Sequence, residues 1–182
     1  SRIDPKDPRN RRLYAQALIE TGKSTVAIDV LQALARRLPK DHPEFIEATG
    51  LLGRAHKQIF FDARDKSSAG ARDALKQAIN AYRKPFEANP GVNTWHGVNL
   101  LALLANSRRL GVRSAAGLDL NAVARQLVTS LEATPPETRE RDDWFLPTLA
   151  EACLGLDDWD AVEKHVRAYA ADKDAKAFLV AS

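Results

Sequence analysis

The segment "LYAQALIETGKSTVAIDVLQALARRLP", residues 13–39, decides the fold class. Its apolar residues recur at the three- and four-residue spacing of a helix face; the first pattern runs to Gly22, and a second restarts after Lys23 and stops at Pro39. Glycine suits a tight turn, and proline cannot continue the interior of a helix. The segment therefore predicts two short antiparallel helices, with a small side chain, Ala27, where they cross.

This pattern resembles a tetratricopeptide repeat, and three further helix pairs follow it. Their expected ranges are 45–63 with 78–90, 94–109 with 120–133, and 143–154 with 159–171. The last residues, "KDAKAFLVAS" (173–182), look like the start of another helix. No window shows the period-two alternation of a strand, and such pairs bury their apolar faces only by stacking. The sequence thus predicts an all-α, tetratricopeptide-like right-handed solenoid of about four antiparallel pairs, in one domain spanning residues 1–182.

Composition places the chain among soluble globular proteins. Of its 182 residues, 45% are hydrophobic and 28% are charged, and no apolar run reaches the roughly 20 residues of a membrane helix. A net charge of +3 is too small a bias to predict a nucleic-acid partner. The single cysteine, Cys153, is expected as a buried thiol, and the cytoplasm is the expected location. Because the chain has no methionine, we expect a fragment of a longer multidomain protein.

The residue patterns of catalytic and metal sites do not occur in the sequence. No Gly-rich phosphate loop or nucleophile elbow is found, and no two histidines have the helical spacing of a metal site. The acidic pairs at 142–143 and 157–158 precede expected helices, where carboxylates cap the first turn. We therefore predict no enzyme activity, no catalytic residues, no cofactor and no metal.

Two cations make binding the better-supported function. Arg54 and Lys57 lie three residues apart on one expected helix and share a face. If Gly53 is the small residue at the helix crossing, repeat geometry turns both cations toward the concave groove. Two alternatives stay open: a solvated face whose aliphatic stems lie on apolar neighbours, and an internal ion pair with an acid such as Asp62.

The segment "GVNLLALLANSRR", residues 97–109, leaves two registers open. With Asn99 at the crossing, its amide packs against the partner helix. With Ala102 at the crossing, a polar set that includes His96 and Asn99 faces the groove beside Arg54 and Lys57, together with Leu103 and Asn106. We favour the second register, because alanine packs there without an amide to satisfy. Gly97 permits a close approach of backbone and neighbour in either case.

The large aromatic residues are expected to pack inside the fold. Tyr82 and Phe86 lie four apart on one expected helix, and Trp95, Trp144 and Trp159 fall near helix starts. Aromatic side chains supply much of the apolar area that a helical core buries. We therefore expect all five in the core or at helix contacts.

Three motifs in order carry a more specific resemblance: "GRAHKQIFFD" (53–62), "AYRKPFEANP" (81–90) and "GVNLLALL" (97–104). They resemble the TRAF-binding helical region of the apoptosis signal-regulating kinase family and its bacterial relatives, over about residues 44 to 110. The resemblance implies a regulatory platform that contacts adaptor proteins and neighbouring domains, and in bacterial relatives a nucleotide ligand. The positions it implies are Arg54, Lys57, Asp62, Tyr82, Arg83 and Asn99. Pro85 departs from the pattern and is expected to kink its helix or to mark an unusual end.

These observations predict a non-enzymatic regulatory or scaffold domain that binds a protein segment through its concave groove. The partner is another protein, a peptide or a neighbouring domain of the same parent chain. The alternative is a sensor for a small anion, such as a nucleotide, in the same groove. An extended peptide needs contacts along several helices, including Arg12 and Gln16, whereas a nucleotide needs a compact basic pocket with an aromatic wall.

Overall fold

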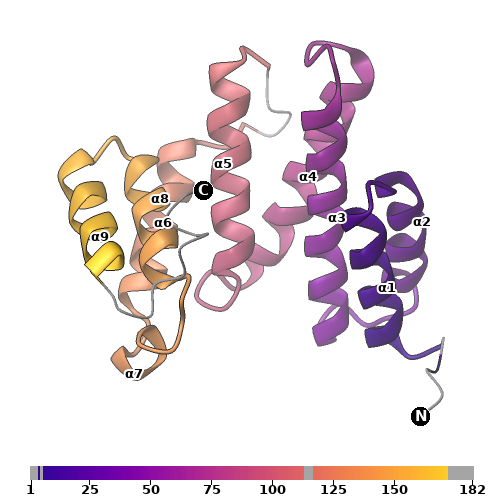
Figure 1. Ribbon diagram of the computed structural model, residues 1–182, viewed down its shortest axis with the longest axis horizontal. Coiled ribbons are helices and arrows are strands. Elements are labelled where there is room, and N and C mark those ends of the chain that lie inside the picture. Colours follow the sequence, from indigo (N-terminus) through magenta and orange to yellow (C-terminus); the bar gives the residue numbers. More distant parts are fainter. Residues whose placement is uncertain (1–3, 5, 113–116, 172–182) are drawn as a thin grey trace. The chain divides into compact units, whose positions relative to one another are not determined.

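The computed structural model describes Asp4, residues 6–112 and residues 117–171. Within these residues the chain forms nine helices and no strand (Figure 1), which confirms the all-α, tetratricopeptide-like fold. The helices are α1 (Pro8–Glu20), α2 (Ser24–Ala35), α3 (Pro43–Asp62), α4 (Ala69–Ala88), α5 (Thr94–Arg109), α6 (Leu120–Glu132), α7 (Pro136–Arg139), α8 (Phe145–Leu154) and α9 (Trp159–Ala171). The helix start expected at 173–182 lies outside the described residues.

Two of the expected boundaries are corrected. Helix α4 begins at Ala69 rather than at residue 78, because the Ser68 hydroxyl accepts a hydrogen bond from the backbone N–H of Ala71 (3.2 Å) and caps the first turn. The one-turn helix α7 begins at Pro136, where the sequence pattern predicted only the end of a helix. A proline has no N–H to lose in a first turn, so it starts a helix as readily as it ends one.

Helix α4 continues through Pro85 to Ala88. Proline lacks the N–H that would bond the carbonyl of Ala81 one turn earlier, so the backbone ladder of α4 is weakened at this position. The expected kink stays a prediction.

Two compact units divide the chain. The first takes the described residues of Ser1–Pro85 and Asn106–Ala116, and the second takes Phe86–Ala105 with the described residues of Gly117–Ser182. The divisions fall within α4 and within α5. The single repeat domain therefore stays a prediction, and each unit is described by itself.

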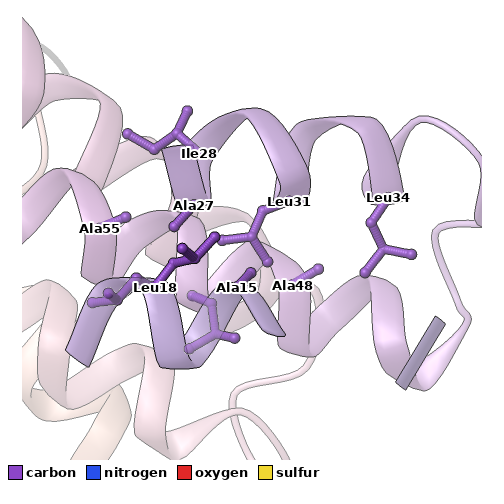
Figure 2. Close-up of a cluster of buried hydrophobic side chains, with 10 residues drawn as sticks. Ala15, Leu18, Ala27, Ile28, Leu31, Leu34, Ala48 and Ala55 are labelled. Carbon is purple, nitrogen blue, oxygen red and sulfur yellow. The ribbon is translucent and has the colours of Figure 1, made fainter. Parts of the chain in front are cut away.

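The core of the first unit lies where α2 packs against both α1 and α3 (Figure 2). Alanine occupies the closest helix contacts, and leucine and isoleucine fill the space around them; the cluster comprises Ala15, Leu18, Ile19, Ala27, Ile28, Leu31, Leu34, Ala48, Leu51 and Ala55. Ala27 is fully buried, as expected for a crossing residue. Gly22 turns the chain from α1 into α2 with a positive φ of 76°, and the N–H of Lys23 donates to the carbonyl of Leu18 (2.8 Å).

In the second unit, two glycines bring helices together. A Cβ at Gly97 would stand 2.5 Å from Cε2 of Phe86, so this position of α5 admits no side chain, as the sequence predicted. A Cβ at Gly155 would stand 2.9 Å from Cδ2 of Leu101, at the end of α8. Helix α8 also packs against α6 and α9. The core of this unit therefore depends on backbone approaches as well as on side chains.

The aromatic residues divide into two groups. Tyr82 and Phe86 are buried, as expected, whereas Trp95, Trp144 and Trp159 are exposed and do not belong to the core. Side chains tilt toward the N-terminus of their helix. A ring at the start of a helix therefore extends past the first turn, beyond the part of the helix that contacts its neighbours.

Candidate functional site

Two ion pairs of opposite polarity link α1 to α3. Near the starts of the helices, Nε of Arg12 lies 2.6 Å from Oε2 of Glu44, and the side chains are only 16% and 18% exposed. At the end of α1, Nη1 of Arg54 lies 3.5 Å from Oε1 of Glu20, with side chains 38% and 51% exposed. The cation belongs to α1 in the first pair and to α3 in the second. The positions of the two pairs show that α1 and α3 run parallel.

The second pair lies within a set of polar and aromatic side chains that α1 and α3 leave at least partly exposed. On α3 these residues recur at spacings of three and four and so share one side of the helix. We call this set the α1–α3 face; it comprises Gln16 and Glu20 of α1 and Arg54, Lys57, Gln58, Phe61 and Asp62 of α3.

Arg54 is held between a buried phenol and an exposed carboxylate. The ring of Tyr82, from α4, packs on the backbone of Gly53, which is buried as expected of a crossing residue. Burial raises the pKa of Tyr82 far above its usual value, and the charge of Arg54 opposes part of that rise. The phenol is therefore neutral, and the partly exposed Arg54 guanidinium lies 3.5 Å from the Glu20 carboxylate.

Asp62 is not the acid that pairs with Arg54. Its carboxylate accepts a hydrogen bond from Nε2 of Gln58 (2.8 Å), one turn earlier on the same helix. Eight residues separate Arg54 from Asp62, which is roughly 12 Å along a helix. The acid that pairs with Arg54, Glu20, was not predicted from the sequence. The sequence feature that marks Glu20 is its spacing of four residues from Gln16, whose amide donates a hydrogen bond to it (3.1 Å).

The other predicted residues belong to the second unit, except Arg83 of α4, which is partly buried in the first. His96 is buried, and its ring meets the Trp95 ring edge-on at 5.1 Å. Asn99 donates from Nδ2 to the carbonyl of Trp95 (2.9 Å), one turn earlier in its own helix. Leu103, expected in the groove, is fully buried, so that part of the favoured register is wrong. The common groove for both sets stays a prediction.

Comparison with protein families assigns the repeat. A family model described as Tetratricopeptide Repeats-Sensor, TPR-S, matches residues 1–104, which is more than half of the 182 residues. The chain belongs to the TPR-S family. The matched part includes Arg54, Lys57, Asp62, Tyr82, Arg83, His96 and Asn99, and it confirms the tetratricopeptide-like part of the expected resemblance. Comparisons with curated proteins and with solved structures found no match.

The remaining candidate groups of the TPR-S chain have structural roles. The carboxylate of Asp158 accepts the backbone N–H of Ala161 (3.1 Å) and caps the first turn of α9, as expected. Asp142 accepts the N–H of Trp144 (3.0 Å), which precedes α8, and the first turn of that helix has no side-chain cap, so the expected cap role of Asp142 is wrong. Cys153 is buried, and burial raises the pKa of its thiol, so it is not a reactive thiolate.

Among the described residues, no group of three or more histidine, cysteine, aspartate or glutamate side chains is arranged to hold a metal ion. In the same part of the chain, no helix is both long and apolar enough to span a membrane.

Proposed function

We propose that this TPR-S domain is a non-enzymatic recognition module that binds an acidic protein segment through the α1–α3 face. Membership of the family indicates a protein-interaction or sensor domain. The observation that carries the proposal is Arg54, a cation more than a third exposed whose internal partner lies 3.5 Å away. In keeping with the resemblance, the segment belongs to a cytoplasmic adaptor or to a neighbouring domain of the parent protein.

The charges of the face define what the segment must offer. Arg54 and Lys57 lie one turn apart on α3, and each can give charge-assisted hydrogen bonds to a carboxylate. Arg12, which a long peptide was expected to contact, is instead engaged with Glu44 at 2.6 Å. The segment therefore binds near the second halves of α1 and α3, and its acidic groups are clustered rather than spread.

A small anion such as a nucleotide is the second candidate. Phe61 is exposed and lies seven residues after Arg54 on the same side of α3, so one face carries two cations and an aromatic ring. Phosphate recognition by arginine and stacking on an aromatic ring are the contacts that a nucleotide uses. The word sensor in the family's description also favours this candidate.

Titration of the 182-residue chain tests both candidates at low salt, where exposed charges are least screened. We expect a short fluorescent polyglutamate peptide to gain anisotropy on binding, and Arg54→Ala to weaken binding by about tenfold or more. The matched control is Arg125→Ala, since this exposed arginine of α6 lies 3.9 Å from Asp119 and should leave binding unchanged. Binding of ATP but not of the peptide would select the second candidate. Equal binding by wild type and Arg54→Ala would contradict both.

A further inference from the structure

The two ion pairs between α1 and α3 differ in the distance between the charged atoms and in the exposure of their side chains. The Arg12–Glu44 pair is short and mostly buried, whereas the Arg54–Glu20 pair is 3.5 Å apart and open to water on both sides. Charge-assisted hydrogen bonds measure about 2.7 to 2.9 Å, so the second pair is a loose contact. Exposed pairs of this kind contribute little to stability. The first pair can set the register of α1 and α3 without the second.

Glu20 is also placed against the preference of its own helix. It is the last residue of α1, where the carbonyl end of the helix carries partial negative charge and disfavours a carboxylate. Its contacts are the loose pair with Arg54 and a hydrogen bond from Gln16 that is itself exposed. The exposed hydrogen bond from Gln16 stabilises the helix only weakly, and core packing does not account for an acid at this position.

We propose that Glu20 is an internal competitor for the ligand of Arg54. In the unliganded chain its carboxylate takes the place that an acidic group of the ligand would take. Binding exchanges one carboxylate for another, and Glu20 is released to water, which its exposure allows. This inference rests on the proposed function, because it requires Arg54 to be the anchoring cation.

The weakness of the Glu20 contact sets the expected effect. A competitor that holds Arg54 as strongly as an exposed ion pair lowers the affinity for an anion by about two- to fivefold. The factor is the same for ligands with one and with several acidic groups, because each of them must displace Glu20 from Arg54.

Affinity measurements on Glu20→Gln test the competition, with polyglutamate peptide and inorganic pyrophosphate as probes. Glutamine keeps the size of the side chain and one acceptor oxygen for the amide of Gln16, but it removes the charge. We expect the variant to bind a probe about two- to fivefold more tightly than wild type. The matched control is Glu163→Gln on α9, whose carboxylate pairs with Arg167 at 2.6 Å, is 62% exposed and gives the same change in net charge. Its affinity should equal that of wild type.

The outcomes separate this inference from the proposed function. Equal or weaker binding by Glu20→Gln, with binding still lost in Arg54→Ala, overturns the competition and leaves the proposed function standing. Failure of wild type and Glu20→Gln to bind either probe overturns both.

A ligand-free measurement provides a second test. In double-mutant cycles, we expect the Glu20–Arg54 pair to change the unfolding equilibrium constant by less than about fivefold, and the Arg12–Glu44 pair by more than about tenfold. Equal coupling in the two pairs would show that Glu20 is a structural partner of Arg54 and would overturn the competition.

Discussion

Gly53 of α3 lies directly against the ring of Tyr82 from α4: a Cβ on residue 53 would stand 2.8 Å from both Cε2 and Cζ of that ring. Tyr82 is fully buried and cannot move away without disturbing the helices around it. The contact brings α3 and α4 together beside Arg54, the residue that follows Gly53. The stability of the fold and the position of the candidate site thus depend on the same close approach.

Gly53→Ala is therefore expected to destabilise the chain by about 1 to 3 kcal/mol, because the added methyl group overlaps the Tyr82 ring. Urea denaturation gives the free energy of unfolding. The matched control is Gly70→Ala in the first turn of α4, where an added Cβ would meet nothing within 4 Å. Alanine is favoured over glycine in a helix, so this control should be neutral or slightly stabilising. Equal stability of the two variants would show that α3 and α4 do not meet at Gly53.

Arg12→Ala is expected to lower the free energy of unfolding by about 2 kcal/mol, because it leaves the mostly buried Glu44 carboxylate without its charge-assisted hydrogen bond. Glu44 lies in the first turn of α3, so the helix dipole still stabilises its carboxylate in the variant and limits the loss. Arg9→Ala removes an exposed arginine from the same helix and should change stability by less than about 0.5 kcal/mol. Thermal or urea unfolding at neutral pH measures both. A loss no larger for Arg12→Ala than for Arg9→Ala would mean that the register of α1 and α3 does not depend on this pair.

Stability should fall as the pH is lowered below the usual histidine pKa of about 6.5. Burial lowers the pKa of His56, and the opposing attraction of Asp73 is the smaller effect. The unfolded chain therefore binds a proton at a higher pH than the folded chain does. The contribution of neutral His56 is complete above the unfolded pKa and is lost as the pH falls toward the folded pKa.

Urea unfolding of wild type and His56→Gln between neutral and mildly acid pH measures this effect. The variant should lose less stability than wild type over that interval. His165, whose pKa burial also lowers, should keep part of the dependence in the variant. Identical pH profiles for the two proteins would contradict the assignment.

Helix positions could be predicted from the sequence because they depend on neighbouring residues. The three- and four-residue apolar spacing located eight of the helices, and Gly22 marked the turn between the first two. Gly53 and Gly97 were recognised as close approaches because a missing side chain within an apolar helix needs a packing reason. The two helix starts that were not predicted also depend on local residues. The Ser68 hydroxyl caps the first turn of α4, and Pro136 is the first residue of α7.

What the sequence by itself determined is a set of amphipathic helices and the faces that they bury, since helical periodicity is a local property of the chain. Only the tertiary structure decided the partners of the exposed charges. Arg54 and Lys57 were singled out by their spacing, but the acid beside Arg54 is Glu20, 34 positions earlier in the chain, and not nearby Asp62. The packing of α1 against α3 leaves the Arg12–Glu44 pair mostly buried and the Arg54–Glu20 pair exposed. Burial and long-range pairing follow from how helices pack, which no local spacing specifies.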